Sequence, residues 1–193
     1  MTGIVFERHH GEHSITVLED IADLYTEIHE QEPYDDPIFS RESFIARTSR
    51  QAQKTGFELL TARKDNELAG FSFGYTMPTG DWWEDATPPQ HNVLGSSKFA
   101  VIELDVANTH RGQGLGKELL GQLLADRSED FATLAALQGT PAHAMYLRWR
   151  WYIVGSIGGE GPVMDAMLLP LRGPGAAERS DEAEEPVRAH DLR

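Results

Sequence analysis

Hydrophobic and polar positions alternate along this chain with two different periods. Period-two stretches, typical of half-buried strands, predict strands over 3–9, 57–63, 68–77, 99–106, 131–137, 152–156 and 162–171. Apolar residues at helical spacing predict an amphipathic helix over 18–30, and three further helices are expected after Ser40, from Leu115 and after Thr140. Strands and helices interspersed in this way predict a mixed α/β (α+β) fold.

Local signals set several boundaries of these elements. Pro33 ends the first helix, Ser40 is a suitable N-cap for the second, and Gly56 is a suitable stop. The Asp65-Asn66 pair between the second and third strands suits a tight hairpin turn. The segment 78–97 is longer than an ordinary connection, which favours a functional role for it.

The centre of the pattern is the segment 98–127. In the strand 99–106 the even positions are all apolar, so we expect one face to lie wholly in a core. The odd positions begin apolar and end in Glu103 and Asp105, so the other face should be part core and part site. After a bend, leucines at helical spacing from Leu115 give the next helix a broad apolar face.

The bend itself is glycine-rich and basic, Arg111-Gly-Gln-Gly-Leu-Gly-Lys117. The backbone N–H groups of 113–117 are expected to point outward from a helix N-terminus, where the helix dipole is positive. Such a bend predicts a phosphate or pyrophosphate site. It does not fit a Walker loop, because Arg111 and Glu118 stand where that loop needs Gly and Ser or Thr. It does not fit the dinucleotide GxGxxG pattern either, because Lys117 and Leu119 stand where its third glycine belongs in the two possible frames.

The pattern Arg111-x-x-Gly114-x-Gly116 after a strand resembles the coenzyme A signature of the GNAT acetyltransferases, and the order of elements over 3–171 resembles that family too. The resemblance implies a GNAT fold, with a central, mostly antiparallel sheet of about seven strands and about four helices. It implies acetyl-CoA as the acyl donor. The residues expected to bind this cofactor are Leu104, Asp105, Val106, Arg111, Gly112, Gln113, Gly114, Leu115, Gly116, Lys117 and Thr140.

The same resemblance assigns two catalytic roles. Tyr146 matches the tyrosine whose hydroxyl protonates the departing sulfur, and a phenol is close enough in pKa to a thiol to do so. Glu103 resembles the acid that takes the amine's proton, directly or through water, provided that burial raises its pKa. The chain departs from the family at Thr140, where asparagine is common, and at Arg150, where glycine is common.

Candidate acceptor-binding residues lie in two loops. Tyr34 and Asp35 follow the first helix, where substrates of the resembled family often bind, although a plain polar connection explains them equally well. In 78–97, Trp82, Trp83 and Glu84 could recognise an ammonium group by cation–π and charge contacts, or could be a hydrophobic plug or a dimer contact.

Composition narrows the function classes. The chain has 193 residues, no cysteine and a formal net charge of −14, which argues against a nucleic-acid partner. No apolar stretch is long enough to span a membrane and no signal peptide is visible, so we predict a cytoplasmic protein. The histidines in His9-His10-Gly-Glu-His13 lack the HExxH spacing, and we predict no metal. The sequence leaves open whether the protein forms a homodimer.

These observations predict a single domain over 1–172 followed by an acidic, disordered tail over 173–193. The favoured function is an acetyl-CoA-dependent N-acetyltransferase acting on a primary amine of a small molecule by direct attack on the thioester. The alternatives are a non-catalytic acyl-CoA-binding module, or an acyltransferase that uses a longer acyl group or a peptide amine. The sequence does not identify the acceptor.

Overall fold

A computed structural model describes residues 3–29, 39–158 and 163–172, so Tyr34, Asp35 and the predicted tail lie outside the described residues. Its strands are β1 (Val5–His10), β2 (Glu58–Lys64), β3 (Glu67–Met77), β4 (Lys98–Val106), β5 (Phe131–Leu137), β6 (Tyr152–Ile157) and β7 (Met164–Pro170). Its helices are α1 (Leu18–His29), α2 (Arg41–Gln51), α3 (His91–Leu94), α4 (Leu115–Leu123) and α5 (Pro141–Arg148), with 3₁₀ turns at Gly11–Val17 and Asn108–His110. None of the helices in these ranges combines the length and the apolar character that crossing a membrane requires.

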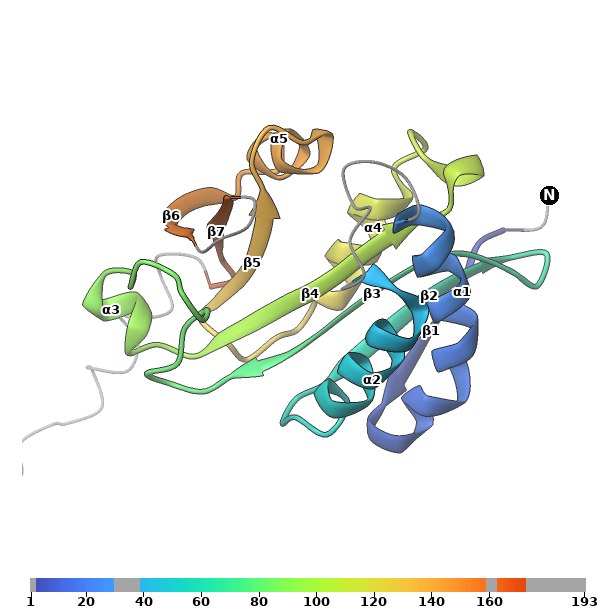
Figure 1. Cartoon of the computed structure of the whole chain (residues 1–193), viewed down its shortest axis with the longest axis horizontal. Coiled ribbons are helices and arrows are strands. Elements are labelled where there is room, and N and C mark those ends of the chain that lie inside the picture. Colours follow the sequence, from blue (N-terminus) through green and yellow to red (C-terminus); the bar gives the residue numbers. More distant parts are fainter. Residues whose placement is uncertain (1–2, 30–38, 159–162, 173–193) are drawn as a thin grey trace, which may run out of the picture.

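The strands form one seven-stranded sheet in the order β1-β2-β3-β4-β5-β7-β6 (Figure 1). Only β4 and β5 pair in parallel, and every other neighbouring pair is antiparallel. The predicted mixed α/β fold with a mostly antiparallel sheet is therefore confirmed.

Most boundaries follow the local signals. The side chain of Ser40 accepts a hydrogen bond from the Ser43 N–H at 3.3 Å, as expected of an N-cap. Asp65 and Asn66 both have positive φ, +52° and +69°, which is the type I′ geometry that suits a two-residue hairpin. The second helix ends at Gln51 rather than continuing to Gly56.

Two apolar clusters hold helices on opposite faces of the sheet. The helices α1 and α2 cover one face of β1–β4, and α4 packs on the other (Figure 1). The first cluster joins Phe44, Phe71 and Phe73 to the buried face of α1. The second joins Leu119 and its neighbours on α4 to β2–β5 and continues to α5. The expected leucine face of α4 is buried here, with Leu115, Leu119, Leu120 and Leu123 all inside.

The strand β4 contains a β-bulge that the alternation of its residues does not show. Phe73 of β3 lies opposite Glu103, but the next residue, Gly74, lies opposite Val101, so Ile102 is the extra residue. The bulge turns Ile102 toward the α1–α2 cluster. The expectation that all even positions share one face was wrong, because the bulge reverses the alternation. The residues that face the second cluster, on the α4 side, are odd-numbered before the bulge and even-numbered after it: Phe99, Val101, Leu104 and Val106.

The parallel strands β4 and β5 separate soon after they begin to pair. Their register covers only Lys98–Phe131, Phe99–Ala132 and Ala100–Thr133, and the two strands then diverge (Figure 1). From Val101 onward the edge of β4 that faces β5 has no ladder partner there. Backbone N–H and C=O groups of β4 are thereby exposed to a space between the strands.

The long segment 78–97 lies along the other end of the sheet. Ala86 forms an isolated bridge with Ile157 of β6, and the Thr87 N–H donates to the Ser156 carbonyl at 2.9 Å. The segment contains α3, whose C-terminal carbonyls accept hydrogen bonds from the buried ammonium of Lys98. This part of the chain is therefore built into the fold.

Candidate active site

A cavity of about 810 Å³ opens where β4 and β5 diverge. One wall is the end of β4 with the following bend, the second is the first turns of α4 and α5, and the third is the end of α1. Its volume lies within the usual range for a cofactor or drug-sized ligand. The diverging strands therefore open a ligand-sized space at the exposed edge of β4.

The glycine-rich bend presents the N-terminus of α4 to the cavity. Gly112 and Gly114 have φ of +73° and +87°, a conformation that glycine adopts without steric cost, and Gly114 is the N-cap of α4. The first intrahelical bond runs from the Glu118 N–H to the Gly114 carbonyl, so the preceding N–H groups have no carbonyl partner within the helix. The Arg111 Nε donates to the Val106 carbonyl at 3.1 Å, which fixes the bend against β4.

The positive side chains of Arg111, Lys117 and Arg148 also line the cavity. They provide a local positive patch on a chain of net charge −14. A phosphate-bearing ligand would meet these cations together with the helix N-terminus.

The helix α5 closes the opposite wall. The hydroxyl of Thr140 donates to the Leu137 carbonyl at 2.8 Å and accepts from the His143 N–H at 3.2 Å, so it caps the helix and also lines the cavity. Met145 and Trp149 line the cavity. Tyr146 does not line it: the residue is 9% exposed and packs in the core cluster behind the wall.

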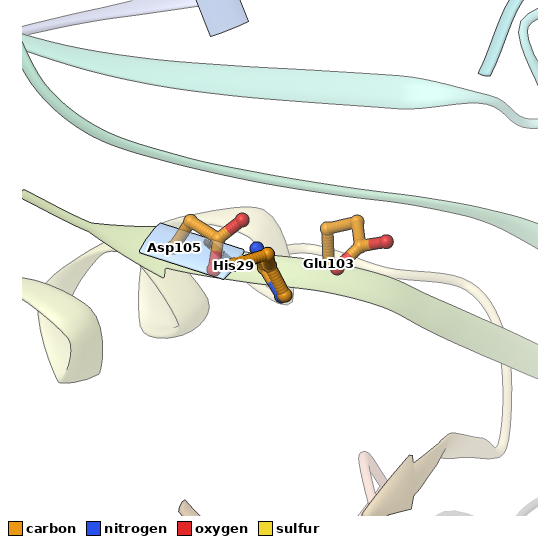
Figure 2. Close-up of side chains that lie close together, drawn as sticks. All are labelled: His29, Glu103 and Asp105. Atoms are coloured by element: carbon orange, nitrogen blue, oxygen red, sulfur yellow. The ribbon is translucent and has the colours of Figure 1, made fainter. Parts of the chain in front are cut away.

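Two carboxyls and one imidazole meet on the α1 side of β4 (Figure 2). One ring nitrogen of His29 and one carboxylate oxygen from each of Glu103 and Asp105 all lie within 4.8 Å of one another. The bulge places both acids on this face, and the Ser72 Oγ–H donates to the Glu103 carbonyl at 2.8 Å, which supports that geometry.

Burial shifts the proton affinities of these groups. Desolvation raises the pKa of Glu103 to about 7, although the guanidinium of Arg47, with Nη2 3.5 Å from Oε1, opposes the rise. The pKa of Asp105 is also raised, first by desolvation and then by the charge of Glu103. Burial lowers the pKa of His29. The condition placed on Glu103 as a base, a pKa raised by burial, is met.

The structure gathers most of the predicted cofactor residues around one cavity. Every residue predicted to bind the cofactor lines the cavity except Gln113. The Gln113 side chain donates to the Thr109 carbonyl at 3.0 Å. Glu103 lies behind the cavity wall, next to Asp105.

The predicted tryptophan pair lies elsewhere. Trp82, Trp83 and Glu84 are not among the residues that line the cavity. The Trp83 Nε1–H donates to the Thr133 hydroxyl at 2.9 Å, on the sheet. Their role in acceptor binding stays a prediction.

Sequence reasoning missed His29 and Arg47. His29 lies four residues after Tyr25 on the buried stripe of α1, and the ring centroids of the two residues are 3.9 Å apart. A titratable residue at the edge of an apolar stripe was the available signal. Arg47 lies on the polar side of an ordinary helix pattern and carried no such signal.

The cluster has donor types that a metal ion accepts, but its charge is already partly matched by Arg47. The His9 Nε2 lies 3.0 Å from the Thr61 hydroxyl, in a hydrogen bond with the sheet. The absence of a metal from either group stays a prediction.

Residues 15–150 match the model of the Acetyltransferase (GNAT) family. This match spans well over half of the chain, and the chain belongs to that family. The resemblance drawn from the glycine-rich bend and the order of elements is thereby confirmed.

Individual relatives are distant. A GCN5-like protein acetyltransferase of Mycobacterium tuberculosis is 28% identical over 105 residues, which cover 47% of this chain and 48% of that protein. The chain thus matches about half the length of this curated relative. YncA of Salmonella typhimurium, solved with its cofactor acetyl-CoA, has a TM-score of 0.61 at 14% identity, covering 91% of this chain and 98% of YncA. The PaiA N-acetyltransferase of Thermoplasma acidophilum, solved with coenzyme A, has a TM-score of 0.59 at 12% identity, with coverages of 87% and 99%. At these identities the likeness to the two structures shows the fold alone.

Proposed function

We propose that this protein is an acetyl-CoA-dependent N-acetyltransferase that acts on a primary amine of a small molecule. One observation carries the proposal. A single cavity joins the glycine-rich bend at α4 to the open edge of β4 and to Asp105. Two proteins of similar fold were solved with coenzyme A or acetyl-CoA, which supports the choice of donor.

In this proposal the cofactor lies along the wall formed by β4 and the bend. Its pyrophosphate accepts hydrogen bonds from the N–H groups at the start of α4, next to Arg111 and Lys117. Its pantetheine arm runs along the part of β4 that β5 leaves unpaired. The hydroxyl of Thr140 is near the other side of the arm.

The chemistry is direct attack of a neutral amine on the thioester carbonyl. A backbone N–H of β4 near Val106 stabilises the oxyanion of the tetrahedral intermediate. The C–N bond forms, the C–S bond breaks, and Tyr146 protonates the departing thiolate. Glu103, with a pKa of about 7, supplies the negative charge that favours removal of the amine's proton.

A cationic small molecule is the acceptor that the charges favour. Asp105 lines the cavity and Glu103 lies next to it behind the wall, so an alkylammonium group would meet the Asp105 carboxyl beside a second acid. This charge pattern favours an amine over an alcohol as the acceptor.

The test is an acceptor screen with the full chain. Alkylamines, aminoglycosides and peptide N-termini are incubated with acetyl-CoA, and thiol release and the mass of the acetylated product are measured. Turnover on a small alkylamine supports the proposal, and faster turnover on peptides would change the acceptor class. Tight acetyl-CoA binding without any acetylated product would favour a binding module instead.

A further inference from the structure

The imidazole of His29 is held in a fixed orientation beside the acidic pair. Its Nδ1 lies 2.9 Å from the Tyr25 carbonyl, and since that oxygen can only accept, Nδ1–H is the donor. The ring stacks on Tyr25 with centroids 3.9 Å apart and on Phe39 with centroids 5.5 Å apart. In the neutral ring the lone pair is therefore on Nε2.

The three groups of the cluster differ in their access to the cavity. His29 and Asp105 line it, whereas Glu103 does not and is paired with Arg47. In Figure 2 the imidazole lies between the two carboxyl groups. A ligand in the cavity therefore reaches His29 and Asp105 before it reaches Glu103.

Asp105 contains a buried oxygen that lacks a partner within the described chain. The residue is 7% exposed, and its Oδ2 has no hydrogen-bond partner. Leaving a buried acceptor without a hydrogen bond is unfavourable, so a donor that enters the cavity would be stabilised there. An ammonium group brings both a positive charge and donors.

We propose that the acceptor's ammonium group docks between His29 and Asp105 and transfers its proton to Nε2 of His29. This inference rests on the proposed acetyltransferase function and specifies where the amine binds and which group deprotonates it. The acceptor class is an alkylamine that is protonated in solution. Glu103 acts through His29, since its charge stabilises the imidazolium that forms.

The protons balance in this scheme. The R–NH₃⁺ group gives one proton to His29 and becomes R–NH₂, which attacks the carbonyl. The nitrogen of the tetrahedral intermediate then loses a second proton to solvent, and the thiolate gains one from Tyr146. Tyr146 regains a proton from solvent and His29 releases the one it took, so both return to their starting forms. No oxidant or metal takes part.

The surroundings of His29 keep it neutral before the amine arrives. Burial lowers its pKa, and the cations of Arg47 and Arg111 lower it further, while its hydrogen bond to the Tyr25 carbonyl opposes the shift. The other titratable groups that face it are Glu103, Asp105 and the Tyr25 hydroxyl, whose own pKa burial raises. A neutral imidazole is the form that can accept a proton.

The experiment compares two acceptors with the variant His29→Gln. An alkylamine must lose a proton before it attacks, whereas an arylamine is uncharged at pH 7 and needs no base for that step. We expect kcat/KM for the alkylamine to fall at least tenfold more than kcat/KM for the arylamine. The acid limb of the wild-type pH profile for the alkylamine should disappear in the variant. His91→Gln, an exposed histidine outside the cavity, is the matched control.

Asp105→Asn and His29→Asn provide independent tests with the full chain. Asp105→Asn should raise KM for the alkylamine at least fivefold more than KM for the arylamine. His29→Asn should repeat the larger loss on the alkylamine. An equal loss on both acceptors in a folded variant would assign His29 a structural role and overturn the inference. An unchanged rate on the alkylamine would overturn it as well, with the proposed function intact. If the wild type acetylates neither acceptor, the proposed function itself fails and this inference fails with it.

Discussion

The indole of Trp151 packs edge-on against the phenol of Tyr146, with ring centroids 6.0 Å apart and ring planes at 66°. The contact completes a Schellman motif at the end of α5. The Trp151 N–H donates to the Tyr146 carbonyl at 3.1 Å, and the Arg150 N–H donates to the Leu147 carbonyl at 3.0 Å. The motif anchors Tyr146 in the core next to the cavity wall.

Arg150 has φ of +69° in this motif, a left-handed conformation that favours glycine. Arg150→Gly should therefore stabilise the protein by about 1 kcal/mol, because the side chain's steric penalty is removed. Arg148→Gly, two residues earlier in the right-handed helix, should destabilise it by about 0.5–1 kcal/mol. Urea unfolding of both variants gives their free energies of unfolding relative to the wild type. Destabilisation by both would show that Arg150 makes contacts worth more than the penalty.

A negative charge in the glycine-rich bend should weaken the binding of acetyl-CoA. Gly114→Asp places a carboxylate at the N-cap of α4, facing the proposed pyrophosphate, and should weaken acetyl-CoA binding at least tenfold, about 1.4 kcal/mol. Gly114→Ala controls for the strain of φ +87°, and Gly121→Asp places the same charge on α4 outside the cavity. Calorimetry on folded protein gives the dissociation constants. Unchanged binding by Gly114→Asp would place the cofactor elsewhere.

The raised pKa of Glu103 predicts a pH-dependent stability. Its pKa rises from 4.5 to about 7 on folding, so the folded state binds the proton more tightly. The stability that this group contributes is present below pH 4.5 and is lost as the pH rises through 7. At about 1.4 kcal/mol per pKa unit, the loss is up to about 3 kcal/mol.

Glu103→Gln should abolish that part of the pH dependence. The difference in free energy of unfolding between variant and wild type should grow in the variant's favour from pH 4.5 to 8. Glu67→Gln, at an exposed position of β3, serves as the control. A difference that is the same at all pH values would mean that the Glu103 carboxyl is not desolvated.

The two tryptophans of the segment 78–97 should respond differently to the same change. Trp83→Phe removes the hydrogen bond to Thr133 and should cost about 1 kcal/mol of stability. The Trp82 Nε1 is buried with no hydrogen-bond partner in the described structure, so Trp82→Phe should be neutral or slightly stabilising. In both variants KM for the amine should stay within twofold of the wild-type value. A large rise in KM at unchanged stability would instead support the acceptor-binding role predicted from the sequence.

The sequence was sufficient for the glycine-rich bend and for the order of strands and helices along the chain, because both depend on short-range patterns. Glycines with positive φ, an apolar stripe on α4 and alternating strands each determine local structure directly. The bulge in β4 depends on its pairing with β3. Its only local sign was Gly74, where an added Cβ would lie 2.2 Å from the Ala100 carbonyl oxygen.

The cluster around His29 could not be predicted for a similar reason. His29 is 74 residues away from Glu103 in the sequence, and only the packing of α1 on the bulged end of β4 brings them together. Periodicity identified the buried stripe of α1 but not which residue of β4 it would meet. Side-chain proximity across the sheet is a property of the tertiary structure.

The central claim is that acetyl transfer occurs in this cavity with Tyr146 as the proton donor. Donation to the sulfur develops only as the thioester breaks, so its loss should lower kcat without weakening cofactor binding. The decisive measurement is kcat and the acetyl-CoA dissociation constant for Tyr146→Phe, which retains the packing against Trp151. The account predicts a kcat at least tenfold lower, within the ~10²–10⁴-fold range of general acid catalysis, and an affinity within about threefold. Turnover at the wild-type rate on a good amine acceptor would contradict it.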